Sequence, residues 1–383
     1  MPISRYPRTF VDVHVIQSVP PANINRDDTG SPKQAIYGGT RRARVSSQAW
    51  KRATRLALSD AMPGESLGVR TKRLADLVAQ RLVREQAIDP EVALRVATAV
   101  VEATGITMDK KDKNHTSYLL FVGESQVDRI AAAVGAVATR LGTLDAKGLK
   151  TEAAKVDIKP ILRAGHSLDV ALFGRMVADL ADLNVDASTQ VAHAVSTHAV
   201  DLQFDYFTAV DDTNPAEETG AGMIGTIEFN SATLYRYATV AVHQLAETLE
   251  DTSGAVAGTL GFVEAFAKSI PGGYQNSFAH RTRPSLVLVV VRDDQPVNLV
   301  TAFERPVEAS DGIESASVGR LASEFRAATA MWADEPRLVA ATYDPGRTSS
   351  ADVRAAFGDA LTFDDMLGRL GSSLLGRAQV ASE

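Results

Sequence analysis

The sequence predicts an α+β fold, and three observations support this. Short segments rich in Val, Ile and Phe alternate with long Ala-rich stretches that repeat apolar residues every three or four positions. Two further apolar segments flank an acidic turn, as in a β-hairpin. With 383 residues and 45% hydrophobic content, the chain can bury a sizeable core, divided into two or more units.

The N-terminal region predicts a strand, a loop and a helix. Thr9 to Ser18 is rich in β-prone residues, and we expect Pro20 and Pro21 to end that strand. Residues 23–39 are rich in Asn, Asp, Gly and Pro and predict a loop. A helix should then begin at Ser46 or Ser47, either of which could cap it. Its predicted apolar stripe is Trp50, Ala53 and Ala57.

Residues 61–185 predict a helical region. Helical spacing of apolar residues is clearest over Thr71–Ala87, Glu91–Thr104 and Gln126–Leu141. The polar stretch from Asp109 to His115 interrupts it as a loop. A second basic stretch, diluted by acids, contains Lys147 and Lys150.

The second half predicts a long hairpin and a buried strand. Residues 204–210 and 223–229 are the arms of the hairpin, and the segment between them is acidic. Leu286 to Val291 is uniformly apolar and short, which is typical of a buried strand. Residues 239–250 and 316–331 should be helical.

The charge distribution points to a polyanionic partner. Residues 29–59 contain seven basic residues and no acid, although the whole chain has a formal net charge of −7. Unpaired like charges repel, so their clustering favours an external anion, of which nucleic acid is the best candidate. Residues 176–235 contain ten acids and no Lys or Arg. Unlike surfaces on one subunit would also permit head-to-tail contact between copies.

Several classes of protein are disfavoured. The chain has no cysteine, which excludes disulfides and thiolate chemistry and fits a cytoplasmic location. MPISRYPRTF does not resemble a secretory signal, and the longest apolar run is far too short to span a bilayer, so we expect no membrane association.

Two apparent motifs have simpler explanations. Gly220 to Gly225 matches G-x-G-x-x-G, but a β-prone segment follows instead of the helix that dinucleotide binding needs, so we expect turn glycines. His193 and His198 are five residues apart, which does not place both rings on one helix face for zinc. We expect polar contacts within the fold and no metal or other cofactor.

Two further groups leave alternatives open. Asp27 and Asp28 adjoin the basic segment and could hold Mg²⁺ for cleavage of a phosphodiester, or Arg26 and Asp28 could fix the loop through hydrogen bonds. In the hairpin, Tyr206, Phe207, Met223 and Ile224 could bury against their own domain or wedge between bases.

Five segments in the same order resemble the CasC family, the backbone subunits of type I-E CRISPR Cascade complexes, in the RAMP superfamily. The resemblance covers about residues 8–335. The matching segments are Asn23–Asp28 with Tyr37–Gly39 and Arg41–Arg52, then Asp169–Met176, Ala192–His198, Phe207–Asp212 and Glu228–Tyr237.

The resemblance implies a hand-shaped molecule with an RRM-like (ferredoxin-like) palm, helical fingers and a hairpin thumb. On this basis 1–60, 186–200 and 229–383 belong to the palm with C-terminal helices, 61–185 to the fingers and 201–228 to the thumb. Several copies would stack along one CRISPR guide RNA with other Cascade subunits and present the guide for pairing with target DNA. The implied subunit is non-catalytic; a metal-dependent ribonuclease using Asp27 or Asp28 is the alternative.

The resemblance also implies residue roles. The guide backbone would be held by Arg26, Ser46, Gln48, Lys51 and Arg52, with Lys33, Arg41, Arg42 and Arg44 extending the track. Such contacts fix the register without reading sequence. Four residues would wedge against bases: Met176 of the fingers, and Phe207, Met223 and Ile224 of the thumb. Lys147 and Lys150 would attract target DNA.

Overall fold

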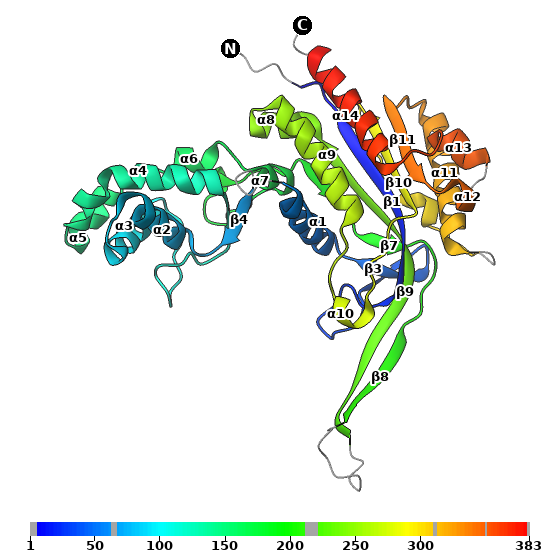
Figure 1. Ribbon diagram of the computed structural model, residues 1–383, viewed down its shortest axis with the longest axis horizontal. Coiled ribbons are helices and arrows are strands. Elements are labelled where there is room, and N and C mark those ends of the chain that lie inside the picture. Colours follow the sequence, from blue (N-terminus) through cyan, green and yellow to red (C-terminus); the bar gives the residue numbers. More distant parts are fainter. Residues whose placement is uncertain (1–5, 63–66, 211–220, 309–311, 349–350, 381–383) are drawn as a thin grey trace. The chain divides into compact units, whose positions relative to one another are not determined.

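A computed structural model describes residues 6–62, 67–210, 221–308, 312–348 and 351–380 (Figure 1). The described residues form two compact units. The first contains 59–189 and 242–258, and the second contains 7–58, 190–241 and 259–383. The first unit spans the range that the resemblance assigns to the fingers and also includes 242–258. We call the two parts the finger unit and the palm unit.

The finger unit is a helical assembly around one apolar core. Its core comes mainly from α2, α3 and α4, for example Val78, Val100 and Ile130, each 0% exposed. A small antiparallel pair, β4 with β5, adjoins these helices. The bounds are β4 Gly68–Thr71, α2 Leu74–Gln86, α3 Pro90–Ala103, β5 Leu120–Gly123, α4 Glu124–Gly142, α5 Ala146–Ala153, α6 Lys159–Arg163, α7 Leu168–Phe173, η2 Ala181–Leu183 and α8 Val242–Leu249.

The ends of these helices follow from local sequence. Asp89 accepts hydrogen bonds from the first turn of α3, and Pro90 occupies its first helical position, where no backbone N–H donor is needed. Asp145 caps α5 in the same way. The three helices predicted from periodicity are therefore confirmed, with ends shifted by at most three residues.

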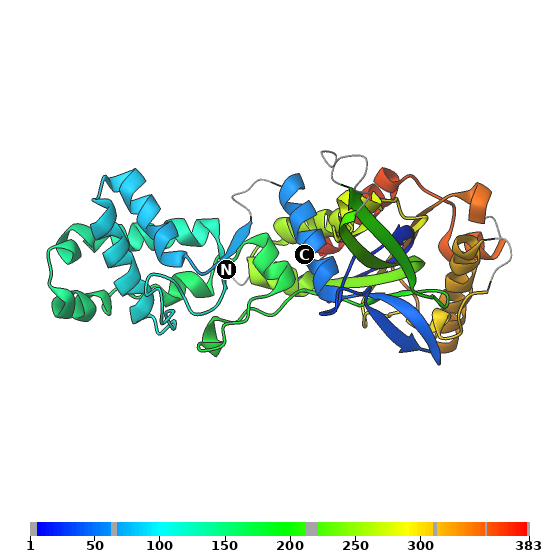
Figure 2. The ribbon, with the colours of Figure 1, turned by 90° about the horizontal axis from the view of Figure 1, so that it is seen from below.

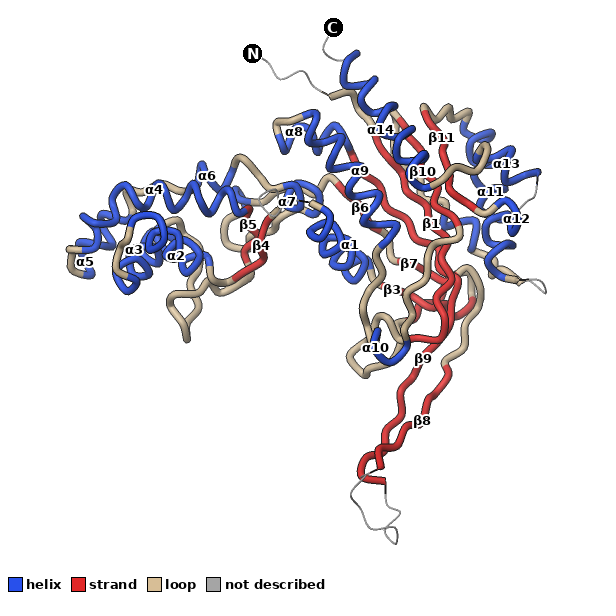
Figure 3. The backbone as a smooth tube through the Cα atoms, viewed as in Figure 1, coloured by secondary structure: helices blue, strands red, loops and turns tan. Residues whose placement is uncertain are grey.

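The palm unit is built on a long antiparallel sheet (Figure 3). Strand order is β11-β10-β1-β9-β7-β3-β2, and β6 and β8 also pair with β9. The central strand β1 pairs with β9 on one side and β10 on the other. The bounds are β1 Phe10–Ala22, β2 Gln34–Tyr37, β3 Thr40–Val45, β6 Thr189–Val191, β7 Ala194–Ser196, β8 Gln203–Val210, β9 Ala221–Ala241, β10 Leu286–Arg292 and β11 Leu338–Tyr343.

Helices bury both faces of this sheet. Ile16, Tyr235 and Leu288 pack with Leu321 and Phe325 of α11 in one core cluster. On the other face Met366 of α14 contacts Thr342 of β11. Because both faces are covered, β10 is apolar from Leu286 to Val291, and every residue of the strand, including the final Arg292, is buried. The bounds are α1 Ser47–Ala61, α9 Thr252–Lys268, α10 Gln275–Phe278, η3 Val300–Phe303, α11 Ile313–Trp332, α12 Pro345–Thr348, α13 Ala351–Phe357 and α14 Phe363–Val380.

Two N-terminal predictions are wrong. Strand β1 continues through Pro20 and Pro21 to Ala22, because its pairing with β9 is irregular between Val19 and Ala22 and the prolines lie within that irregularity. The predicted loop to Gly39 contains strand β2, which forms a hairpin with β3. Gly38 and Gly39, both with positive φ, make the two-residue turn. Figure 2 shows this blue hairpin reaching the yellow segment, where Tyr37 donates a hydrogen bond to the Val300 carbonyl.

The predicted α+β class is confirmed at this level, and so are the hairpin and the buried strand. The hairpin arms are β8 and the first part of β9. Residues 239–241, predicted as helix, belong to the end of β9, and α8 starts at Val242. No described helix is long and apolar enough to cross a membrane.

Buried His14 on β1 should make the protein sensitive to acid. Its Nδ1 lies 2.9 Å from the Tyr235 hydroxyl, and burial lowers its pKa from 6.5 to about 3. The unfolded chain therefore binds a proton that the folded chain does not, and stability falls as pH drops below about 6.5. We expect His14→Asn to remove about 1.4 kcal/mol per pH unit from this slope between pH 6 and about 4. Urea unfolding across that range measures it.

The control is Ile36→Asn, which places the same amide at a 72% exposed position of β2 and removes no titratable group. This variant should keep the wild-type slope. Equal slopes in wild type and His14→Asn would contradict a neutral, buried His14.

Candidate nucleic-acid interface

The loop between β1 and β2 is held in a defined shape. Buried Asn23 donates hydrogen bonds to the carbonyls of Gly30 and Glu228, both at 2.9 Å. One oxygen of Asp27 accepts from the Thr29 backbone N–H, the Thr29 hydroxyl and the Ser31 N–H, and these bonds lower the Asp27 pKa. The loop borders a groove of about 550 Å³.

Arg26 projects from this loop and is exposed. Its guanidinium lies 4.5 Å from the centre of the Tyr274 ring, which orients it, and no carboxylate of the described residues forms an ion pair with it. Asp28 is also exposed, and no ion pair joins it to Arg26 within the described residues. The alternative that Arg26 and Asp28 fix the loop is therefore wrong: Asp27 and Asn23 fix it. In the described part of the chain, no three acids or histidines lie close enough to hold a metal ion.

The N-terminus of α1 faces this loop through hydrogen bonds. The Ser46 hydroxyl accepts from the Ala49 N–H at 3.2 Å, so Ser46 is the cap of α1. The Ser46 N–H donates to Asn25, and the Ser47 N–H donates to Nδ1 of His193. No acid occupies the first turn. The positive end of the helix dipole therefore adds to the basic side chains and suits a phosphate.

Three expected contacts project from α1. Gln48 and Arg52 are exposed and Lys51 is half-buried. Ser46 is only 9% exposed and its hydroxyl already caps the helix. Ser46 therefore positions the helix end, and the side chains that can reach a ligand are the other three.

Strand β3 divides its arginines between two faces. Arg41 is exposed, whereas Arg42 is fully buried and its Nη atoms donate to the carbonyls of Ser196, Phe303 and Glu304. Successive side chains on a strand point to opposite faces, so both cannot belong to one surface track. Because Arg42 is 0% exposed, a ligand cannot reach its guanidinium in this structure, and the side chain instead joins β3 to β7 and η3.

Lys33 and Arg44 lie together, and the Arg44 N–H donates to the Lys33 carbonyl. Burial lowers the pKa of His193, and the nearby charges of Arg44 and Lys33 lower it further. Nδ1 of His193 accepts from the Ser47 N–H and so carries no proton, and the ring lies close to these two cations. The loop, α1 and β3 thus bring together one basic surface, the basic track, formed by Arg26, Lys33, Arg44, Gln48, Lys51 and Arg52. Exposed Arg41 points to the opposite face of β3 from Arg44 and lies outside it.

The histidines behave as polar contacts within the fold, as expected. His193 accepts from Ser47, and Nε2 of His198 accepts from the Thr233 N–H at 3.1 Å. They serve different strands and do not converge on one site.

The hairpin β8–β9 has two different faces. In the pairing register, Phe204, Tyr206 and Ile224 share one face, and Phe207 lies on the opposite face across from Gly225. The first three are 65%, 63% and 60% exposed. The Phe207 ring covers Gly225, where a Cβ atom would lie 2.3 Å from Cζ of the ring. Phe207 and Ile224, expected to wedge together, therefore face opposite ways. The Met223 side chain and Gly220 lie outside the described residues.

Met176 of the finger unit is 81% exposed. The preceding residue, Arg175, is buried and donates to the carbonyls of Leu183 and Leu162 at 2.8 and 2.6 Å. Burial lowers the Arg175 pKa to about 10, so it stays charged at pH 7. These bonds fix the backbone from which Met176 projects. Lys147 and Lys150 are exposed on α5.

Sequence reasoning missed the segment around α10. A Cβ on Gly273 would lie 2.6 Å from the Ile24 carbonyl oxygen, so glycine is needed for this loop to contact the loop of Arg26. Beside it Gln275 and Asn276 are exposed, and Arg281 and Arg283 follow as further exposed cations. No local pattern signals this contact, because the two loops are far apart in sequence.

The chain resembles known proteins in sequence and structure. The profile of the CT1975-like protein family matches residues 11–368. A search of curated proteins found no match. Two solved structures cover 95% of this chain. One, described as a CRISPR RNA-guided surveillance complex, pre-nicking, has 31% identity, a TM-score of 0.82 and 100% coverage of its chain. The other, described as a CRISPR RNA-guided surveillance complex, has 29% identity, a TM-score of 0.73 and 99% coverage.

Proposed function

The chain belongs to the CT1975-like protein family and is a backbone-type subunit of the CRISPR-associated class, and on that premise we propose that it binds CRISPR guide RNA without cleaving it. Several copies stack head to tail along one guide in a type I-E Cascade complex, with other Cascade subunits, and present the guide for pairing with target DNA. In this proposal the palm unit is an RRM-like palm, the helical unit forms the fingers and β8–β9 is the thumb.

One observation carries the proposal: the basic track is a single surface built from three elements. It combines exposed cations, a helix N-terminus without an acid and a neutral histidine, and it contains side chains suited to phosphate. A contact surface of this kind holds a guide of any sequence, because base pairing and not the protein reads the target.

The hydrogen bonds of Asp27 argue against the hydrolytic alternative. One of its oxygens accepts three hydrogen bonds that shape the loop, so its role in the fold is already accounted for. We therefore propose a scaffold role and assign no catalytic residue. Lys147 and Lys150 on the fingers would approach target DNA.

Native mass spectrometry of the protein with guide-length CRISPR RNA and Mg²⁺ tests this function. Several copies on one intact RNA are expected. The ribonuclease would be established instead if the wild-type protein shortened the RNA in Mg²⁺ and the RNA stayed intact with EDTA or with the Asp27→Ala variant. Absence of bound RNA, also after co-expression with the other Cascade subunits, would refute both.

The exposed face of the thumb should hold bases out of the stack. Aromatic and aliphatic side chains contact any base, at about 1–3 kcal/mol per stacked base. We expect Tyr206→Ser with Ile224→Ser to let the guide restack, so that 2-aminopurine at the displaced positions becomes dimmer. RNA affinity should fall less than tenfold, because the phosphate contacts remain.

The matched control is Leu375→Ser on α14, which removes a 51% exposed apolar side chain elsewhere. Phe207→Ala is the informative second variant. If it dims 2-aminopurine while the Tyr206 and Ile224 double variant does not, the face that contacts the bases is the one with Phe207.

A further inference from the structure

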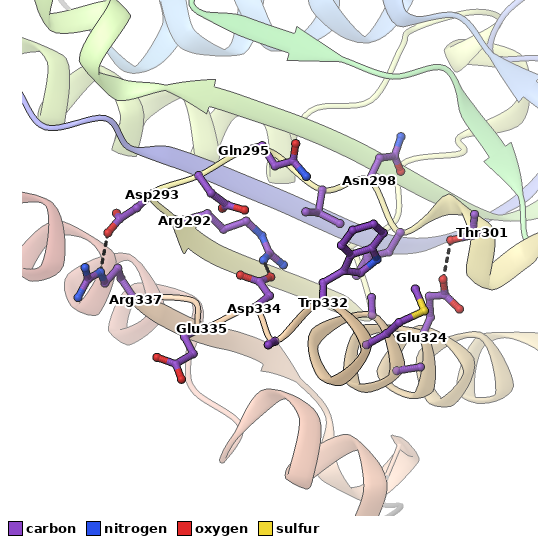
Figure 4. A pocket seen from close by; sticks show the side chains of 17 residues that line it. Arg292, Asp293, Gln295, Asn298, Thr301, Glu324, Trp332, Asp334, Glu335 and Arg337 are labelled. Atoms are coloured by element: carbon purple, nitrogen blue, oxygen red, sulfur yellow. Dashed lines mark hydrogen bonds and ion pairs between the residues drawn. The ribbon is translucent and has the colours of Figure 1, made fainter.

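The palm unit contains a cleft that shares no residue with the basic track. Its volume is about 920 Å³, and it lies between the segment after β10, η3, the last turns of α11 and the link to β11 (Figure 4). All of these elements belong to the palm unit.

One wall of the cleft is apolar and unusually exposed. Met331 and Trp332, the last two residues of α11, are 75% and 76% exposed. Ala333 adopts a left-handed conformation with φ of 49°, and the Asp334 N–H donates to the Thr329 carbonyl, which ends the helix at this point. Figure 4 shows Trp332 standing over the cleft. A tryptophan and a methionine exposed side by side are typical of a protein contact.

The other walls carry an excess of negative charge. Five carboxylates and two guanidinium groups line the cleft. Both cations are already paired: Arg292 with Asp12 and Asp334, and Arg337 with Asp293 at 2.6 Å. By contrast, Asp294, Glu324 and Glu335 have no cation within ion-pair distance among the described residues. Within the described parts of the chain, the Glu324 carboxylate accepts one side-chain hydrogen bond, from the Thr301 hydroxyl at 2.6 Å.

This chemistry selects the occupant. A nucleic acid would be repelled by the unpaired carboxylates, and a purely apolar segment would leave them desolvated without partners. A guanidinium or ammonium group can instead stack on the Trp332 ring and donate hydrogen bonds to the carboxylates. An adjacent apolar side chain can then cover Met331.

We propose that this cleft docks a segment of another protein that presents an arginine or lysine beside an apolar side chain. Trp332 is the anchor, since tryptophan and arginine are the residues that most often dominate binding energy at interfaces. Asp294 and Glu324 supply the charge that selects a cation. The inference does not depend on guide binding, because it uses different residues of the palm unit.

The test uses the full-length protein and a fluorescein-labelled, amidated peptide of alternating arginine and leucine, measured by fluorescence anisotropy. A peptide of alternating glutamate and leucine is the probe control and should not bind. We expect Trp332→Ala and Asp294→Lys each to weaken binding of the basic peptide about tenfold or more. Both residues are exposed, so neither variant should unfold the protein.

Matched protein controls separate docking from general attraction to an acidic chain. Leu119→Ala removes a 60% exposed apolar side chain and Glu102→Lys reverses an exposed acid, both in the finger unit. Unchanged affinity in both controls is expected. Equal weakening in the controls, or no binding by wild type, would overturn the proposal. So would self-association in sedimentation that Trp332→Ala abolishes, because a second copy would then be the occupant.

Discussion

Reversing two charges on α1, Lys51→Glu with Arg52→Glu, should weaken binding of guide RNA about a hundredfold at moderate salt. Each lost phosphate contact stops releasing counterions, so the plot of log K against log salt should become shallower by roughly 1.4. Arg52 is exposed and Lys51 half-buried on the first turns of α1. Titration of labelled guide-length CRISPR RNA at several salt concentrations measures both quantities.

A control with the same change in net charge is Arg326→Glu with Arg369→Glu. These exposed arginines lie on α11 and α14, outside the basic track. Their reversal should alter affinity only through long-range screening, by about threefold or less. If both double variants lose affinity equally, RNA binding responds to net charge and the basic track is not its site.

Asp12→Ala should destabilise the protein by about 3–5 kcal/mol. Its carboxylate accepts from Nε of Arg292 and the Val297 N–H, both at 3.0 Å, and from the Tyr237 hydroxyl at 2.8 Å. Burial raises the Asp12 pKa despite the nearby guanidinium, so the pair compensates for desolvation more than it adds net stability. The alanine variant removes the Asp12 acceptor from buried Arg292, and it also leaves the Val297 N–H and the Tyr237 hydroxyl without this acceptor.

Urea unfolding at pH 7 measures this loss. Asp12→Asn keeps the size and one acceptor, so it should lose less than the alanine variant. A control at an exposed carboxylate, Asp364→Ala on α14, should change stability by less than about 0.5 kcal/mol. A loss below about 1 kcal/mol in Asp12→Ala would mean that Arg292 is satisfied without it.

Much of the fold could be predicted from local signals. The finger helices follow from apolar spacing and caps, because that information lies within each segment. The β2–β3 hairpin shows a limit. Its Gly38-Gly39 turn is a strong signal, but the arginine-rich flank of β3 conceals the strand. Pro20 and Pro21 wrongly predict the end of β1. The strand tolerates them because its pairing with β9 is irregular there, and that irregularity depends on a partner strand far away in the sequence.

The basic track was predictable as a set of residue types and not as a surface. Sequence clustering identifies Arg41 and Arg42 equally, but the register of β3 exposes one and buries the other. The two thumb faces separate Phe207 from Ile224 in the same way. Tyr274 and Gly273 approach Arg26 only through tertiary folding. The sequence therefore predicts which residue types form the site, but the direction in which each side chain points depends on strand register and tertiary contacts.

The pairing of β1 determines when the palm can form during synthesis. Its partners are residues 230–241 of β9 and strand β10, which ends at Arg292. At about 5–20 residues per second, the ribosome adds the last partner roughly 15–55 s after β1 emerges. Until residues 230–241 of β9 are added, roughly 11–44 s after β1 at the same rate, Val11, Val13 and Val15, all fully buried in the finished sheet, have no partner strand to pair with. The nascent chain thus carries an unpaired apolar strand while its finger helices can already pack, which makes early palm folding slow and dependent on protection from aggregation.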